Sequence, residues 1–149
     1  MLRRCASATL ALMLAGLACA ADTMNPLTGL PVPDAASGIK LDPPVRLDPA
    51  QVCKSTQTTE FYTTRGFKTS AAIAWYSAHL KGFTHLHGYG AGRTQDIFVN
   101  ADGTLDVVVT GSRGPDGADS DVYAVSYATL KPGMSQKTFT GLLSQKTVC

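Results

Sequence analysis

Three histidines are the densest group of reactive side chains in this sequence. His79, His85 and His87 are its only histidines, and they lie within nine residues. If residues 83–89 form a strand, His85 and His87 share one face, because side chains alternate along a strand. Two imidazoles at that spacing suit a Zn²⁺ or Cu²⁺ ion. No neighbouring Cys or Glu completes the ligand set, so the alternative is that they are ordinary surface side chains.

A second polar group lies in a long loop. Residues 111–121 are expected to connect two strands, and they present charged side chains on a rigid hairpin, which we interpret as a surface for binding a partner. The spacing does not match a calcium loop, which needs a Gly at position six and a Glu at position twelve. Turn formation and solubility alone also explain such aspartates. The charged residues are Arg113, Asp116, Asp119 and Asp121.

The sequence offers little for covalent or acid–base catalysis. It has no Gly-x-Ser-x-Gly motif, and Glu60 is its only glutamate, which excludes a pair of catalytic glutamates. The glycines of residues 88–92 lie between expected strands rather than before a helix, which argues against a phosphate-binding loop. A pair of aspartates stays open. We therefore expect a protein without enzymatic activity and without a cofactor.

The first twenty residues have the pattern of a secretory signal peptide. Arg3 and Arg4 precede an apolar stretch, and the small residues up to Ala20 fit the cleavage rule. The stretch is shorter than the roughly 20 residues that span a bilayer. We expect a periplasmic or secreted protein, cleaved near Ala20 and without a transmembrane span. The alternative is a lipid anchor at Cys19, although the residues before it match the acylation motif poorly.

Cleavage would leave a chain of balanced charge. Arg3 and Arg4 belong to the 13 Lys and Arg residues, so 11 would remain against 11 Asp and Glu. A balanced net charge disfavours nucleic acid and anionic membranes as primary partners. A protein in the periplasm is therefore the partner we expect.

Two further segments follow the signal peptide. Residues 21–47 contain five prolines and no helical or strand periodicity, which predicts an extended leader. Residues 48–149 are expected to form one compact domain. Its helix begins at Thr69 or Ser70, which can cap it, and continues to about Lys81. Strands are expected at residues 58–63, 83–89, 95–99, 104–110 and 122–130.

This β-α-β-β-β order predicts an α+β fold, with one helix centred on Trp75 and packed on a mostly antiparallel sheet of four or five strands. Both faces of the sheet carry apolar residues. The helix would cover one face, and the leader or a partner would cover the other. The tail, residues 134–149, gives no clear signal. Alternation places Tyr123, Val125 and Tyr127 on one face of the last strand and Val122, Ala124 and Ala128 on the other.

Two hypotheses about function follow. The first is a non-catalytic binding module in the periplasm, for example an inhibitor or immunity-type protein for a secreted hydrolase. The second is a metal-handling protein that uses the three histidines. Retention of a protein from periplasmic extract would support the first, and binding of Zn²⁺ or Cu²⁺ would support the second.

A disulfide bond between Cys53 and Cys149 is the first testable prediction. Signal cleavage removes Cys5 and Cys19, and a remaining pair in an oxidising compartment is most simply bonded. The bond would close nearly the whole domain, which is worth about 4 to 5 kcal/mol in the chain-entropy model. Reduction should therefore lower the melting temperature by many degrees. Intact-mass analysis after alkylation without reductant should find no free thiol, and two alkylated thiols would contradict the bond.

Overall fold

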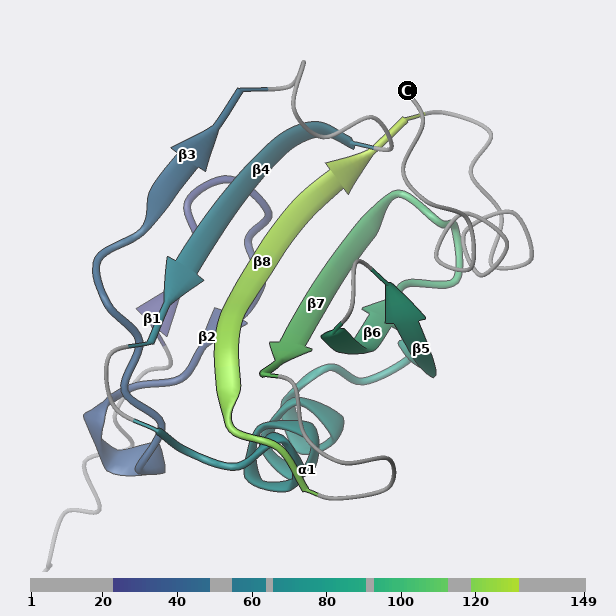
Figure 1. Ribbon diagram of the computed structural model, residues 1–149. Helices are drawn as coiled ribbons and strands as arrows, with labels where there is room; N and C mark the ends of the chain where they lie inside the picture. Colours follow the sequence, from purple (N-terminus) through teal and green to yellow (C-terminus); the bar gives the residue numbers. More distant parts are fainter. Residues whose placement is uncertain (1–22, 49–54, 64–65, 91–92, 113–118, 132–149) are drawn as a thin grey trace, which may run out of the picture.

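Figure 1 shows the computed structural model, which describes residues 23–48, 55–63, 66–90, 93–112 and 119–131. The predicted signal peptide, disulfide and C-terminal tail lie outside these residues. The described chain forms an α+β fold with one α-helix, a six-stranded antiparallel sheet and a two-stranded sheet. The predicted class is confirmed, but the main sheet has more strands than the four or five expected. No helix in the described part is long and apolar enough to cross a membrane.

The main sheet has the strand order β3-β4-β8-β7-β6-β5. Strands β5 to β8 follow one another as a meander, and the helix α1 carries the chain from β4 to the far edge of the sheet (Figure 1). The elements are β1 Thr23–Met24, β2 Pro31–Val32, the 3-10 turn η1 Ala35–Ser37, β3 Val45–Leu47, β4 Ser55–Tyr62, α1 Thr69–His79, β5 Thr84–Gly90, β6 Arg93–Val99, β7 Leu105–Gly111 and β8 Val122–Leu130.

The β6–β7 hairpin forms where the sequence predicts it. Asn100 Oδ1 accepts hydrogen bonds from the backbone N–H groups of Thr104 and Leu105, at 2.8 and 3.0 Å. Gly103 adopts a φ of 66°, a left-handed conformation that favours glycine. Asparagine and glycine therefore fix this turn, and with it the register of β6 on β7.

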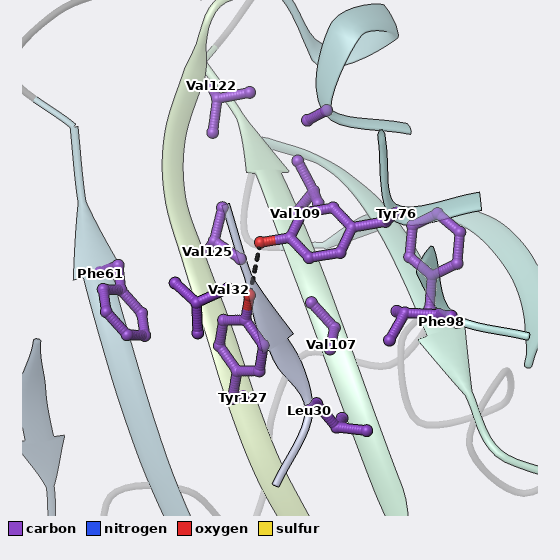
Figure 2. Packing of buried hydrophobic residues seen from close by; sticks show 12 residues of the cluster. Leu30, Val32, Phe61, Tyr76, Phe98, Val107, Val109, Val122, Val125 and Tyr127 are labelled. Atoms are coloured by element: carbon purple, nitrogen blue, oxygen red, sulfur yellow. Dashed lines mark hydrogen bonds between the residues drawn. The ribbon is translucent and has the colours of Figure 1, made fainter. Parts of the chain in front are cut away.

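The main core lies between α1 and the sheet, on the side we call the helix face. Tyr76 of α1 and Tyr127 of β8 are fully buried there, with their hydroxyl oxygens 2.7 Å apart (Figure 2). Tyr127 donates its single hydroxyl hydrogen to the carbonyl oxygen of Pro31, at 3.0 Å. Tyr76 must therefore be the donor to Tyr127. Burial raises the pKa of both tyrosines, so both hydroxyls stay protonated.

The leader belongs to this same core. Leu30 and Val32 are buried together with residues of α1, and the Pro31 carbonyl supplies the acceptor that Tyr127 needs. The expectation that the leader covers the face opposite the helix is therefore wrong. That opposite face, here called the outer face, has a buried cluster of its own, formed by Ile97, Val99, Val108, Ala128 and Leu130.

A bulge in β8 changes one predicted face. Thr110 pairs with Ala124 but Gly111 pairs with Val122, which leaves Tyr123 as the extra residue. Val122 is thereby turned into the main core, whereas Tyr123 is exposed. The prediction that Tyr123 shares a face with Tyr127 is wrong because strict alternation fails at the bulge.

The packing of the leader generates a prediction. Leu30→Ala should destabilise the protein by about 2 to 3 kcal/mol, because it opens a cavity beneath β2. Leu27→Ala, at a half-buried leader position outside the core cluster, should cost clearly less. Urea unfolding of both variants measures the difference. Equal and small losses would show that the leader does not contribute to the core.

Candidate functional site

The predicted partner-binding loop is anchored at its C-terminal end. Asp119 Oδ1 accepts hydrogen bonds from Thr69 Oγ1 and from the Ser70 backbone N–H, at 2.8 and 3.0 Å. These bonds cap the start of α1, because the side chain of its own N-cap residue, Lys68, makes no capping hydrogen bond. The expected capping residues, Thr69 and Ser70, thus lie inside the helix and donate to Asp119.

Hydrogen bonds favour the negatively charged form of Asp119. Hydrogen bonds from Ser70, and then from Thr69, lower the pKa of Asp119. Asp121 forms an ion pair with Lys68 at 2.9 Å. Both aspartates therefore connect the C-terminal end of the loop to the start of α1. Arg113 and Asp116 lie outside the described residues.

The structure separates the three histidines into two groups. His79 lies on α1, where its ring stacks on Trp75 with centroids 4.0 Å apart and its Nδ1 lies 2.7 Å from the Trp75 carbonyl oxygen. His85 and His87 lie on β5, on the helix face. The predicted shared face of these two residues is confirmed, because they lie directly opposite Phe98 and Asp96 of β6.

Asp96 joins the two strand histidines. One carboxyl oxygen, Oδ1, lies 3.0 Å from His85 Nε2 and 2.9 Å from His87 Nδ1. Asp96 is buried, His87 is largely exposed, and His85 stacks on Phe98. The sequence signal for Asp96 was available, since alternation places this charged residue on the same face of its strand as Phe98.

The contacts with Asp96 orient the two imidazoles, but they do not form a complete metal site. Among the described residues, no group of three or more His, Cys, Asp or Glu side chains is placed to hold a metal ion. Both histidine nitrogens that face Asp96 already hydrogen-bond to the same oxygen. The second ring nitrogen of each imidazole has no hydrogen-bond partner among the described residues.

The outer face carries a different cluster, which we call the Tyr123 surface. Tyr123 is 42% exposed. The guanidinium carbon of Arg93 lies 3.6 Å from the centre of the Tyr123 ring, and Tyr62 packs edge-on at 5.7 Å between centroids. The cation–π contact and the ring pair both restrict the Tyr123 side chain. The Tyr123 surface consists of Glu60, Tyr62, Arg93 and Tyr123.

Glu60 and Arg93 give this surface charges that are partly removed from water. Tyr62 donates a hydrogen bond to Glu60 Oε2 at 3.4 Å. Burial raises the pKa of Glu60, although the bond from Tyr62 and the charge of Arg93 act to lower it. The buried Nη1 of Arg93 has no hydrogen-bond partner in the described part of the chain. A ligand group that accepts a hydrogen bond there would offset the cost of burying that donor.

Sequence reasoning missed the Tyr123 surface. Its members come from β4, β6 and the bulge in β8, so they meet only through the strand order of the folded sheet. The sequence signals were a lone glutamate two residues before a tyrosine and an arginine that follows the glycine-rich residues 88–92.

Comparison with known proteins does not assign this chain to a group. No family model, no curated protein and no solved structure matches it. The function therefore has to be argued from the side chains themselves.

The contacts of Asp96 predict opposite tautomers for its two histidines. In the neutral imidazoles, His85 should carry its hydrogen on Nε2 and His87 on Nδ1, because each must donate to the same carboxyl oxygen. Long-range ¹H–¹⁵N NMR at alkaline pH distinguishes the two forms. In Asp96→Ala, the preference of His87 for Nδ1–H should disappear. An Nε2–H tautomer of His87 in the wild type would contradict this geometry.

The raised pKa of Glu60 predicts how stability changes with pH. Its folded-state pKa lies above the unfolded value, so its contribution to stability is present at acidic pH and is lost as pH rises through the folded pKa. Wild type should therefore lose stability relative to Glu60→Gln as the pH rises from the ordinary glutamate pKa, about 4, through the raised folded-state pKa. Melting temperatures of both proteins across this range test the prediction. A melting temperature of wild type that rises relative to that of Glu60→Gln with increasing pH would contradict it.

Proposed function

We propose that this protein is a non-catalytic binding module that acts in the periplasm or outside the cell and binds a protein partner through the Tyr123 surface. The observation that carries the proposal is the exposed Tyr123 ring held between Tyr62 and the Arg93 guanidinium. Tyrosine and arginine are the residue types that most often dominate binding energy at protein interfaces.

Preorganisation supports this proposal. A side chain that is already restricted loses little conformational entropy on binding, and Tyr123 is restricted on two sides. It projects from the bulge in β8, a strand that pairs with β4 from Ala124 onward and with β7 on both sides of the bulge. The surface is therefore rigid before a partner arrives.

An apolar neighbour extends the surface. Val45 of β3 lies directly opposite Glu60 and is 46% exposed. An exposed valine beside a half-buried carboxylate favours a partner segment that combines an apolar side chain with a cation. Occlusion of a secreted hydrolase is one specific form of this function.

Capture from periplasmic extract with matched variants tests the proposal. Wild type should retain a protein partner, and Tyr123→Ala and Arg93→Ala should each weaken its binding about 30-fold or more, the size of a hot-spot loss. Met24→Ala is the control, because Met24 is also an exposed large apolar side chain but lies on β1, outside this surface.

Two results would overturn the proposal. One is that Tyr123→Ala and wild type retain the same partner equally well. The other is that Met24→Ala weakens binding as much as Tyr123→Ala does.

A metal-handling role is the second candidate, favoured by the convergence of His85 and His87 on Asp96. His79 lies apart from them on α1 and would not contribute. Calorimetric titration with Zn²⁺ and Cu²⁺ tests it. Binding that disappears in the His85→Ala/His87→Ala double variant would support this role, and no heat, or binding unchanged in that variant, would remove it.

A further inference from the structure

The two edges of the main sheet differ in their protection against added strands. The edge strand β3 has three residues, follows Pro43 and Pro44, and carries Arg46. Short length, proline and charge are the devices that block pairing at an exposed edge. The opposite edge strand, β5, has none of them. It has seven residues, all paired with β6, and no proline, lysine, arginine, aspartate or glutamate.

The backbone of β5 therefore offers an open edge in the described sheet. β6 takes only one side of this strand, and no strand lies on its other side among the described residues. In the described part of the chain, no strand takes up the alternate N–H and C=O groups of residues 85–89 that point away from β6.

The side chains of β5 favour a strand with the same pattern. Leu86 is half-buried against the apolar cluster of the outer face, so an apolar residue placed opposite it would extend that cluster. His85 and His87 flank it on the helix face and are exposed. The run His85-Leu86-His87 reads the same in both directions, so pairing with an identical strand about a two-fold axis at its centre places leucine opposite leucine and histidine opposite histidine.

We propose that β5 pairs antiparallel with β5 of a second copy of this chain, in a register centred on Leu86. Leu86 then lies opposite the partner's Leu86, and His85 lies opposite the partner's His87. No charged side chains of like sign are brought together by this register. The two main sheets become one continuous sheet with both helices on the same side.

The histidine contacts are compatible with this register. Asp96 engages His85 Nε2 and His87 Nδ1, so a contact across the interface would use the other ring nitrogens, His85 Nδ1 and Nε2 of the partner's His87. Both are acceptors in the neutral tautomers, and one bridging water satisfies them. The Tyr123 surface lies on other strands, so the proposal stands independently of the function proposed above.

Sedimentation across a concentration series, with the purified exported protein, tests the dimer. Wild type should show a reversible monomer–dimer equilibrium. Leu86→Lys should be monomeric, because it places two like charges opposite each other. Leu47→Lys, at a half-buried position on the protected edge β3, is the matched control and should dimerise like wild type.

Cross-linking tests the register and does not depend on the folding of Leu86→Lys. Under mild oxidation, Leu86→Cys should form a covalent dimer above the wild-type background, because the two introduced thiols lie opposite each other. His85→Cys should cross-link far less, since its opposite residue is the partner's His87. Monomeric wild type at every concentration, or equal cross-linking of Leu86→Cys and Leu47→Cys, would overturn the proposal.

Discussion

The hydrogen-bonded series from Tyr76 through Tyr127 to the Pro31 carbonyl is the interaction on which the rest of the structure depends. It links the helix, the central strand β8 and the leader, three segments far apart in the sequence. Each hydroxyl is buried, so each must find a partner or leave a costly unsatisfied group. The observed arrangement of the three segments meets this requirement, and it puts helix and leader on the same face.

One consequence is that the two faces of the sheet have different roles. Helix and leader together seal the helix face around Tyr127, and they leave the Tyr123 surface on the opposite side uncovered by either of them. The bulge in β8 places two consecutive residues on different faces: Val122 lies in the core of the helix face, and Tyr123 is exposed on the outer face. A binding site built this way needs no mobile parts.

Local patterns predicted the elements well. Alternation and turn residues gave the β6–β7 hairpin, and the strand at residues 122–130 is β8. The expected helix was two residues too long at its C-terminal end, since α1 ends at His79. These features depend on neighbours in sequence, which a single sequence displays directly.

Features that depend on distant residues could not be predicted in the same way. The side of the sheet taken by the leader depends on an acceptor for Tyr127, and the cap of α1 comes from Asp119, about fifty residues further on. The shared face of His85 and His87 was predictable from strand alternation, but the Tyr123 surface was not. Its residues meet only after β4 has paired with β8, which no local pattern records.

Amide hydrogen exchange tests most directly the claim that leader, helix and sheet form one interlocked unit. The Asn25 amide is buried in the leader and bonded to the Leu30 carbonyl oxygen at 2.8 Å. In wild type it should exchange as slowly as the amides of β7 and β8, through global unfolding. In Tyr127→Phe it should exchange faster than they do, because the bonds to Pro31 and Tyr76 are lost. Fast exchange at Asn25 in wild type, with β7 and β8 still protected, would contradict the account.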